Sequence, residues 1–188
     1  MERATIKIFQ NIPTLRTERF ILRRIVRDDV DDIYDYSSNP ETSRYLLWYP
    51  HDDLSVTRTY FKIINRKYKN GTFYDWGIVD AVSGKMIGTC GFTAISELDN
   101  RAEIGYVINP KYKGRGIATE VVRRVIRFGF EVLGLERIEA RYIIGNDASR
   151  RVMEKCGMSF EGIHKHAVRA KGRYFDVGVC AVIAGEHV

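Results

Sequence analysis

The chain has 188 residues, of which 45% are hydrophobic and 29% are charged. This composition is typical of a single globular domain, here 1–188, and it excludes a disordered or collagen-like chain. No apolar run approaches the ~20 residues that a membrane-spanning helix needs. Residues 1–13 also lack the apolar core of a secretory signal. We therefore expect a soluble, cytoplasmic protein with no membrane partner.

The net charge of +6 is distributed unevenly along the chain. Residues 1–100 carry 14 basic and 14 acidic side chains, whereas residues 101–188 carry 16 basic and 10 acidic ones. A positive field confined to one half of the chain indicates an anionic partner for that half. Charge alone does not separate a phosphorylated cofactor from a nucleic acid.

The cysteines and histidines do not have the spacing of a metal site. Cys90, Cys156 and Cys180 are widely separated and form no C-x-x-C pair, so we expect three buried, reduced thiols. His164 and His166 share one face of a predicted strand, but two ligands without a third partner are weak grounds for a metal. We expect no metal cofactor.

Seven segments have the composition or alternation of strands, and four have the periodicity or end signals of helices. After a polar, proline-containing lead-in at 1–14, the expected order is strand, two helices, three strands, helix, strand, helix and two strands. The strands are expected at 20–26, 73–80, 86–95, 101–108, 137–144, 158–169 and 173–183. The helices are expected at 28–38, 55–69, 117–132 and 146–155, with an irregular aromatic stretch at 45–50. This order is typical of a mixed α/β layer without a second domain.

The most informative segment is the turn at 109–120, NPKYKGRGIATE, between a predicted strand and a predicted helix. Gly114 and Gly116 allow the backbone to bend and a ligand to approach closely. The helix that follows presents unpaired N–H groups, and Lys113 and Arg115 add positive charge. The segment is therefore an anion cradle suited to a pyrophosphate, although an ordinary glycine-containing turn has similar features. It is not a Walker loop.

Residues 113–118, KGRGIA, resemble the Q/R-x-x-G-x-G/A acyl-CoA-binding motif of the GNAT acetyltransferases, with Lys113 where the family prefers Gln or Arg. Three further segments resemble the branch that includes the ribosomal-protein N-terminal acetyltransferases. They are LRTERFILR at 15–23, AEIGY at 102–106, and NDASR at 146–150 continuing into EKCGM at 154–158. The resemblance covers almost the whole chain.

The resemblance implies a GNAT-like α/β (α+β) fold. Its sheet would be mixed, mostly antiparallel and seven-stranded, flanked by about four helices and splayed between the 101–108 and 137–144 strands. It implies acetyl-CoA as co-substrate, with the pantetheine arm in the splay, near the backbone of Val107 and Ile108. The cofactor-binding residues at the pyrophosphate end of the coenzyme would be Lys113, Gly114, Arg115, Gly116, Ala118 and Thr119.

Acetyl transfer from a thioester to an amine needs a neutral amine and a proton for the departing thiolate. Glu103 is the expected base, acting directly or through water, and an ordinary ion pair with Arg101 or Arg141 is the alternative. Ser149 is the expected acid, with Tyr106, Tyr142 and Tyr174 as rival donors. Asn146 is expected to contact the coenzyme, and it is also a well-placed helix N-cap.

The acceptor pocket is expected to come from the two early helices and the aromatic stretch, with Trp48 and Tyr49 as substrate-binding residues. Core packing is the alternative for these rings. Asp52 and Asp53 could attract a cationic amine, or belong to a solvated loop.

The resulting hypothesis is an acetyl-CoA-dependent N-acetyltransferase that acts on a primary amine, such as the N-terminal amine of a ribosomal protein. A polyamine or aminoglycoside is the alternative acceptor, because a fold does not determine its substrate. A non-catalytic acyl-CoA-binding module is an alternative of another class. Direct nucleic-acid binding is not favoured, because the strands lack an RNP-like aromatic and basic motif. An exposed last hairpin could pair in a homodimer.

Overall fold

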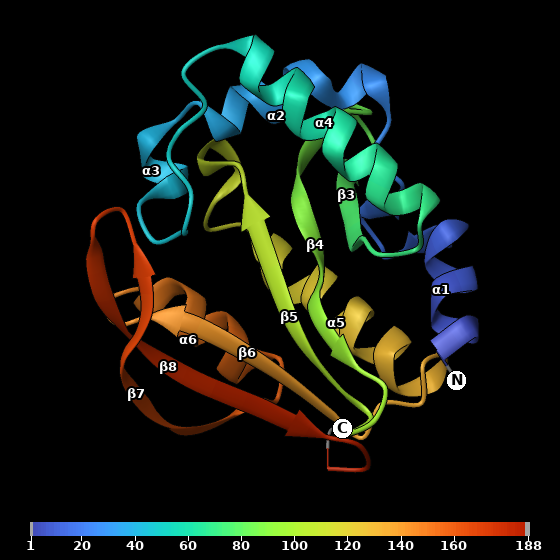
Figure 1. Cartoon of the computed structure of the whole chain (residues 1–188), viewed down its shortest axis with the longest axis vertical. Helices are drawn as coiled ribbons and strands as arrows, with labels where there is room; N and C mark the ends of the chain where they lie inside the picture. The colour runs from blue at the N-terminus through green and yellow to red at the C-terminus, as the bar shows by residue number, and fades with distance from the viewer. Residues whose placement is uncertain (1, 187–188) are drawn as a thin grey trace.

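The computed structural model describes residues 2–186, which form one curved sheet with helices on both sides (Figure 1). The sheet has eight strands in the order β1-β2-β3-β4-β5-β6-β8-β7. Their bounds are Leu15–Arg16 (β1), Phe20–Arg23 (β2), Tyr74–Asp80 (β3), Met86–Ser96 (β4), Arg101–Ile108 (β5), Arg137–Ile143 (β6), Ser159–Ala170 (β7) and Arg173–Ile183 (β8). Every neighbouring pair is antiparallel except β5 and β6, so the predicted mixed, mostly antiparallel sheet is confirmed.

The described α-helices are Glu2–Gln10 (α1), Val30–Ser37 (α2), Pro40–Ser43 (α3), Leu54–Lys69 (α4), Ile117–Glu131 (α5) and Asp147–Lys155 (α6). Short 3-10 helices occupy Arg27–Asp29 and Pro110–Tyr112. None of the helices within residues 2–186 combines the length and the apolar character of a membrane span.

The count of seven strands was one too low, because β1 is only two residues long. Leu15 and Arg16 pair with β2, and two residues cannot display an alternating pattern. The count of about four helices was also too low, since the structure adds α1 and α3. The pair Asn39-Pro40 ends α2 and then begins α3, where the Asn39 side chain accepts the Glu41 N–H at 2.9 Å.

Helix α1 lies inside the segment 1–14 that was described only as a lead-in. Its sequence is amphipathic, and Phe9 anchors it because that ring is completely buried. The Phe9 ring packs edge-on against Tyr74 and Trp76, with centroids 4.7 and 5.7 Å apart. Trp76 in turn contacts Phe128 of α5 at 5.3 Å, so α1 and α5 share one core. In Figure 1, α5 lies behind the sheet, while α2 and α4 pack together in front of it.

The predicted splay lies between β5 and β6. These parallel strands pair only from Arg101 with Arg137 to Ile104 with Ala140. Beyond that point β5 remains paired with β4, whereas β6 follows β8, and Figure 1 shows β5 and β6 diverging. The second half of β5 therefore presents its free edge to an opening.

Candidate functional site

A cleft of about 720 Å³ occupies the splay between β5 and β6. This volume is within the range of small-molecule sites. Its walls come from α3 and the segment after it, β5, β6, the N-terminal end of α5 and one side of α6 along its length. Ten of the predicted site residues line it: Glu103, Val107, Ile108, Lys113, Gly114, Gly116, Ala118, Thr119, Asn146 and Ser149.

At one end of the cleft, the chain turns sharply into α5. Gly114 and Gly116 have φ angles of +77° and +73°, in the left-handed region that glycine adopts without strain. Backbone conformation rather than lack of room for a side chain explains the choice of glycine, because a Cβ on Gly114 would meet nothing within 4 Å. The turn leaves the first N–H groups of α5 without intrahelical partners, since Glu120 is the first residue to donate back, to the Gly116 carbonyl. These groups can bind an anion.

The charged residues of this turn have different partners. Lys113 forms an ion pair with Glu41 of α3 at 2.7 Å, which links the turn to the opposite wall. Arg115 is not among the residues that line the cleft. Its carbonyl accepts a hydrogen bond from Arg19 at 3.0 Å, and its guanidinium lies 5.5 Å from the ring centre of Tyr112. Arg115 therefore shapes the turn from outside the cleft.

Apart from Arg141, the alternative partner of Glu103, three basic residues of the cleft are not among the site residues predicted from the sequence: Arg44, which follows α3, and Arg151 and Lys155 on α6. Arg151 and Lys155 are four residues apart. Residues at this spacing lie on one face of a helix. That spacing is the signal in the sequence that could have identified Arg151 and Lys155.

Glu103 lies on the floor of the cleft on β5. Its carboxylate forms an ion pair with the Nε of Arg141 on β6, at 3.1 Å. Strand alternation places both side chains on the same face of the sheet. Arg101, the other partner considered, pairs with Asp99 instead, at 3.3 Å. The Glu103 side chain is 27% exposed, so the pair borders the open cleft rather than the core.

The hydroxyl groups of Tyr106 and Ser149 meet at 2.8 Å across the cleft wall. Asn146 accepts the Ser149 N–H at 3.3 Å, so it caps α6 as well as lining the cleft. Burial raises the pKa of Tyr106, which keeps its phenol protonated as a potential donor. The rival Tyr174 is 58% exposed and does not line the cleft.

Only the first part of the predicted aromatic stretch lines the cleft. Tyr45, Leu46 and Leu47 line the cleft, whereas Trp48 and Tyr49 do not. The Trp48 ring lies 5.7 Å from that of His51, outside the wall. The Tyr49 ring is near the Lys171 ammonium, with 5.9 Å between the nitrogen and the ring centre. Ligand binding by these two rings remains a prediction.

Other polar groups near the cleft have specific environments. Thr42 of α3 is buried and lines the cleft, and its hydroxyl has no hydrogen-bond partner. Asp53 accepts the backbone N–H groups of Ser55 and Val56, so it caps α4. Asp53 therefore belongs to a helix end rather than to the cleft.

The three cysteines are free and buried, as expected. Burial raises the pKa of Cys156 to about 11, which keeps its thiol protonated. Within residues 2–186, no group of three or more His, Cys, Asp or Glu side chains is arranged to hold a metal ion.

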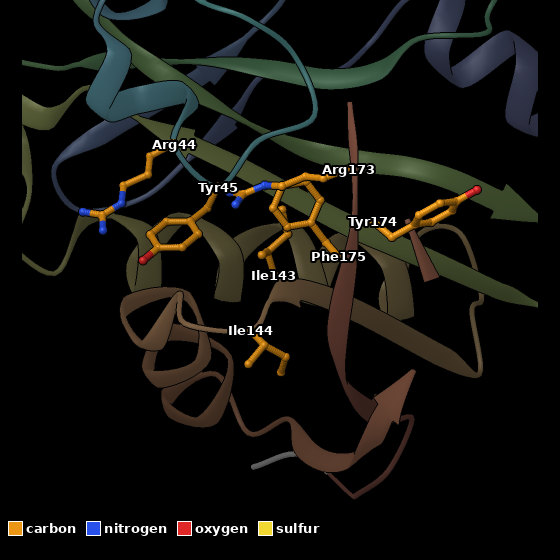
Figure 2. A pocket seen from close by; sticks show the side chains of 7 residues that line it. All are labelled: Arg44, Tyr45, Ile143, Ile144, Arg173, Tyr174 and Phe175. Atoms are coloured by element: carbon orange, nitrogen blue, oxygen red, sulfur yellow. The ribbon is translucent and has the colours of Figure 1, made fainter. Parts of the chain in front are cut away.

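A second pocket of about 330 Å³ adjoins the cleft (Figure 2). The two share Arg44, Tyr45 and Ile143. The second pocket continues to Arg173 and Phe175 at the start of β8. The Tyr45 hydroxyl comes within 3.7 Å of the Cβ position at Gly145, so this ring reaches across to the end of β6.

Comparisons with known proteins agree with this geometry. Residues 19–159 match the family model described as Acetyltransferase (GNAT) domain. The chain is 34% identical over 174 residues to Uncharacterized N-acetyltransferase p20 of Bacillus licheniformis, covering 93% of this chain and 98% of the relative.

Two relatives in Escherichia coli have named acceptors. The [Ribosomal protein uS5]-alanine N-acetyltransferase is 26% identical over 176 residues, covering 88% of this chain and 89% of the relative. The Spermidine N(1)-acetyltransferase is 25% identical over 154 residues, covering 81% and 80%.

A solved structure has the same architecture. The crystal structure of a GNAT-family acetyltransferase from Bacillus anthracis superimposes with a TM-score of 0.81 at 26% identity, covering 91% of this chain and 98% of that one. Since the family model spans most of the chain, the protein belongs to the GNAT acetyltransferase family and is an N-acetyltransferase.

Proposed function

We propose that the protein transfers an acetyl group from acetyl-CoA to the N-terminal α-amine of a protein, in the cleft between β5 and β6. One observation carries the proposal: the open splay ends at a helix N-terminus that is preceded by two glycines with positive φ. GNAT enzymes use acetyl-CoA, and the hydrogen-bond donors and cations that line this cleft are suited to its phosphates. N–H groups of α5 and the cations Lys113, Arg151 and Lys155 would hold them. The free edge of β5 at Val107 and Ile108 would hold the pantetheine arm.

The bound coenzyme would supply an acetyl thioester. In the transfer, a bond forms between the amine nitrogen and the acetyl carbon, and the bond between that carbon and sulfur breaks. Glu103 accepts the proton that the amine loses, directly or through water. The hydroxyl pair of Tyr106 and Ser149 donates a proton to the departing thiolate, and Asn146 holds the Ser149 backbone in place.

The charges around the cleft favour an α-amine over a polyamine. Its carboxylates, Glu41 and Glu103, are each already paired with a cation. A polyamine carries several positive charges and would find no unpaired carboxylate among the lining residues. An α-amine has a pKa of ~8, against ~10.4 for a lysine side chain, so it more readily supplies the neutral nucleophile.

A thermal-shift titration with acetyl-CoA tests the coenzyme site. At 100 times its dissociation constant, the ligand should stabilise the protein by ~2.7 kcal/mol. For a chain of this size that corresponds to roughly 5–11 °C. Ala118→Glu should abolish the shift, because it places a carboxylate at the anion site while remaining compatible with a helix N-terminus. Ser55→Glu, in the first turn of α4, adds the same charge elsewhere and should retain the shift.

Thiol release from acetyl-CoA then tests the acceptor. We expect release with peptides that have a free N-terminal amine and none with the same peptides blocked at that amine. Release with spermidine but with none of the peptides would overturn the proposed acceptor. An absent thermal shift in the wild-type protein would overturn the proposed site.

A further inference from the structure

The second pocket holds cations that have no acidic partner. Arg44 and Arg173 both line it, and neither forms an ion pair with any carboxylate in the described part of the chain. The Arg44 guanidinium lies 5.2 Å from the ring centre of Tyr45, and that of Arg173 lies 4.5 Å from the ring centre of Phe175. In Figure 2 the Tyr45 ring lies between the two arginine side chains. Aromatic rings thus support both guanidinium groups and leave their hydrogen-bond donors available.

A third cation lies beside them. The Lys171 ammonium donates to the Ser43 carbonyl at 2.5 Å, which joins the last hairpin to α3. Burial lowers the pKa of Lys171, and the nearby charge of Arg173 lowers it further. Among residues 2–186, no carboxylate forms an ion pair with Lys171 or Arg173 that would relieve this repulsion. Asp176, on the same strand as Arg173, accepts the backbone N–H of His166 instead.

The cleft contains an unsatisfied polar group close in sequence to the residues that it shares with the pocket. The Thr42 hydroxyl is buried without a partner, two residues before Arg44, and it lines the cleft. A buried hydroxyl without a partner costs stability unless a ligand or water supplies its hydrogen bond. Unpaired guanidinium groups and an unsatisfied hydroxyl together indicate a ligand with anionic, hydrogen-bonding groups.

We infer that the acceptor carries a carboxylate close to its amine, and that Arg44 and Arg173 bind this carboxylate. The inference rests on the proposed function and names its substrate class: an acidic N-terminal segment of a peptide or a free acidic amino acid. Arginine suits this role because its planar fork matches a carboxylate. The same cations lower the pKa of an ammonium group bound beside them, which favours the neutral amine that attacks the thioester.

Three peptides that differ only at their second and third residues test the inference. They begin Ser-Asp-Asp, Ser-Ala-Ala and Ser-Lys-Lys, and kcat/KM is measured for each. We expect the acidic peptide to exceed the neutral one by about tenfold, as one charge-assisted hydrogen bond can supply, and the basic peptide to rank last. Free aspartate and glutamate form a separate arm, which distinguishes a small-molecule acceptor from a peptide.

The variants Arg44→Gln and Arg173→Gln should each reduce the ratio of acidic to neutral kcat/KM towards one. Arg173→Glu should reverse the preference in favour of the basic peptide. Arg169→Gln is the matched control, because Arg169 is an exposed cation on β7 that lines neither pocket, and it should keep the wild-type ratio.

Equal kcat/KM for the three peptides would overturn the inference and leave the proposed function standing. If no peptide is acetylated, the proposed acceptor fails, and calorimetry on the CoA-saturated protein still decides the inference. Tighter binding of the acidic peptide or acidic amino acids in the wild type than in Arg173→Gln would support it. Equal binding would refute it.

Discussion

Replacement of Glu103 by glutamine separates catalysis from folding. The change removes a carboxylate that can accept a proton but keeps the size and shape of the side chain. A positioned general base typically contributes a factor of 10²–10⁴, so we expect turnover to fall by about that factor. This loss corresponds to roughly 2.7–5.5 kcal/mol in the activation barrier.

The effect on the fold should be much smaller. The ion pair between Glu103 and Arg141 is partly open to solvent, with side chains 27% and 45% exposed. Pairs in such positions contribute less than about 1 kcal/mol to the free energy of unfolding. Acetyl-CoA affinity should also persist, because the predicted phosphate site at residues 113–119 does not include Glu103. Stopped-flow acetylation under saturating acetyl-CoA measures the turnover, and urea unfolding measures the stability.

Arg141→Gln is the matched control, because it breaks the same ion pair but keeps the carboxylate. If Glu103 accepts the proton, its replacement should reduce turnover far more than replacement of Arg141. Equal losses of turnover in the two variants would mean that turnover depends on the ion pair itself and not on proton transfer to Glu103. Wild-type turnover in Glu103→Gln would remove this residue from the mechanism.

Three further outcomes follow from the packing and burial of particular residues. A Cβ on Gly88 would lie 2.1 Å from the Val107 carbonyl oxygen, so Gly88→Ala should lower the free energy of unfolding by about 1–3 kcal/mol and weaken acetyl-CoA binding. Urea unfolding and calorimetry measure the two effects, and unchanged values would refute this close approach. Burial raises the pKa of Asp75 to about 7, so the folded state retains a proton that the unfolded chain releases near pH 4. The wild-type free energy of unfolding should therefore fall more steeply than that of Asp75→Asn as pH rises from 4 to 7, by more than about 1 kcal/mol in total, and parallel curves would contradict this. Because the Cys156 pKa is raised to about 11 and all three thiols are buried, maleimide at pH 7.5 should label them only after unfolding, and rapid labelling of the native protein would disprove their protection.

The elements with strong periodic patterns could be predicted from the sequence. The long strands, helix α5 and the last hairpin all appear close to their expected positions. The strand β1 could not be predicted, because two residues cannot display an alternating pattern. Helix α1 is amphipathic, but so short a helix is marginal by itself and forms because its apolar face packs on the core. Leu15 and Arg16 extend as a strand because β2 pairs with them, and α1 depends on the burial of Phe9 among rings contributed by β3 and α5.

The sequence by itself determined the turn at the proposed coenzyme end of the candidate site. Glycines, cations and a helix N-terminus lie within residues 113–119, so local backbone geometry alone brings them together. Only the tertiary structure brought Arg151 and Lys155 of α6 to this end, and only the tertiary structure formed the proposed acceptor end. Arg44 and Arg173 border one pocket because β8 pairs with β6 and places its first residues against the segment after α3. Strand order depends on contacts between residues far apart in the chain, which no local pattern records.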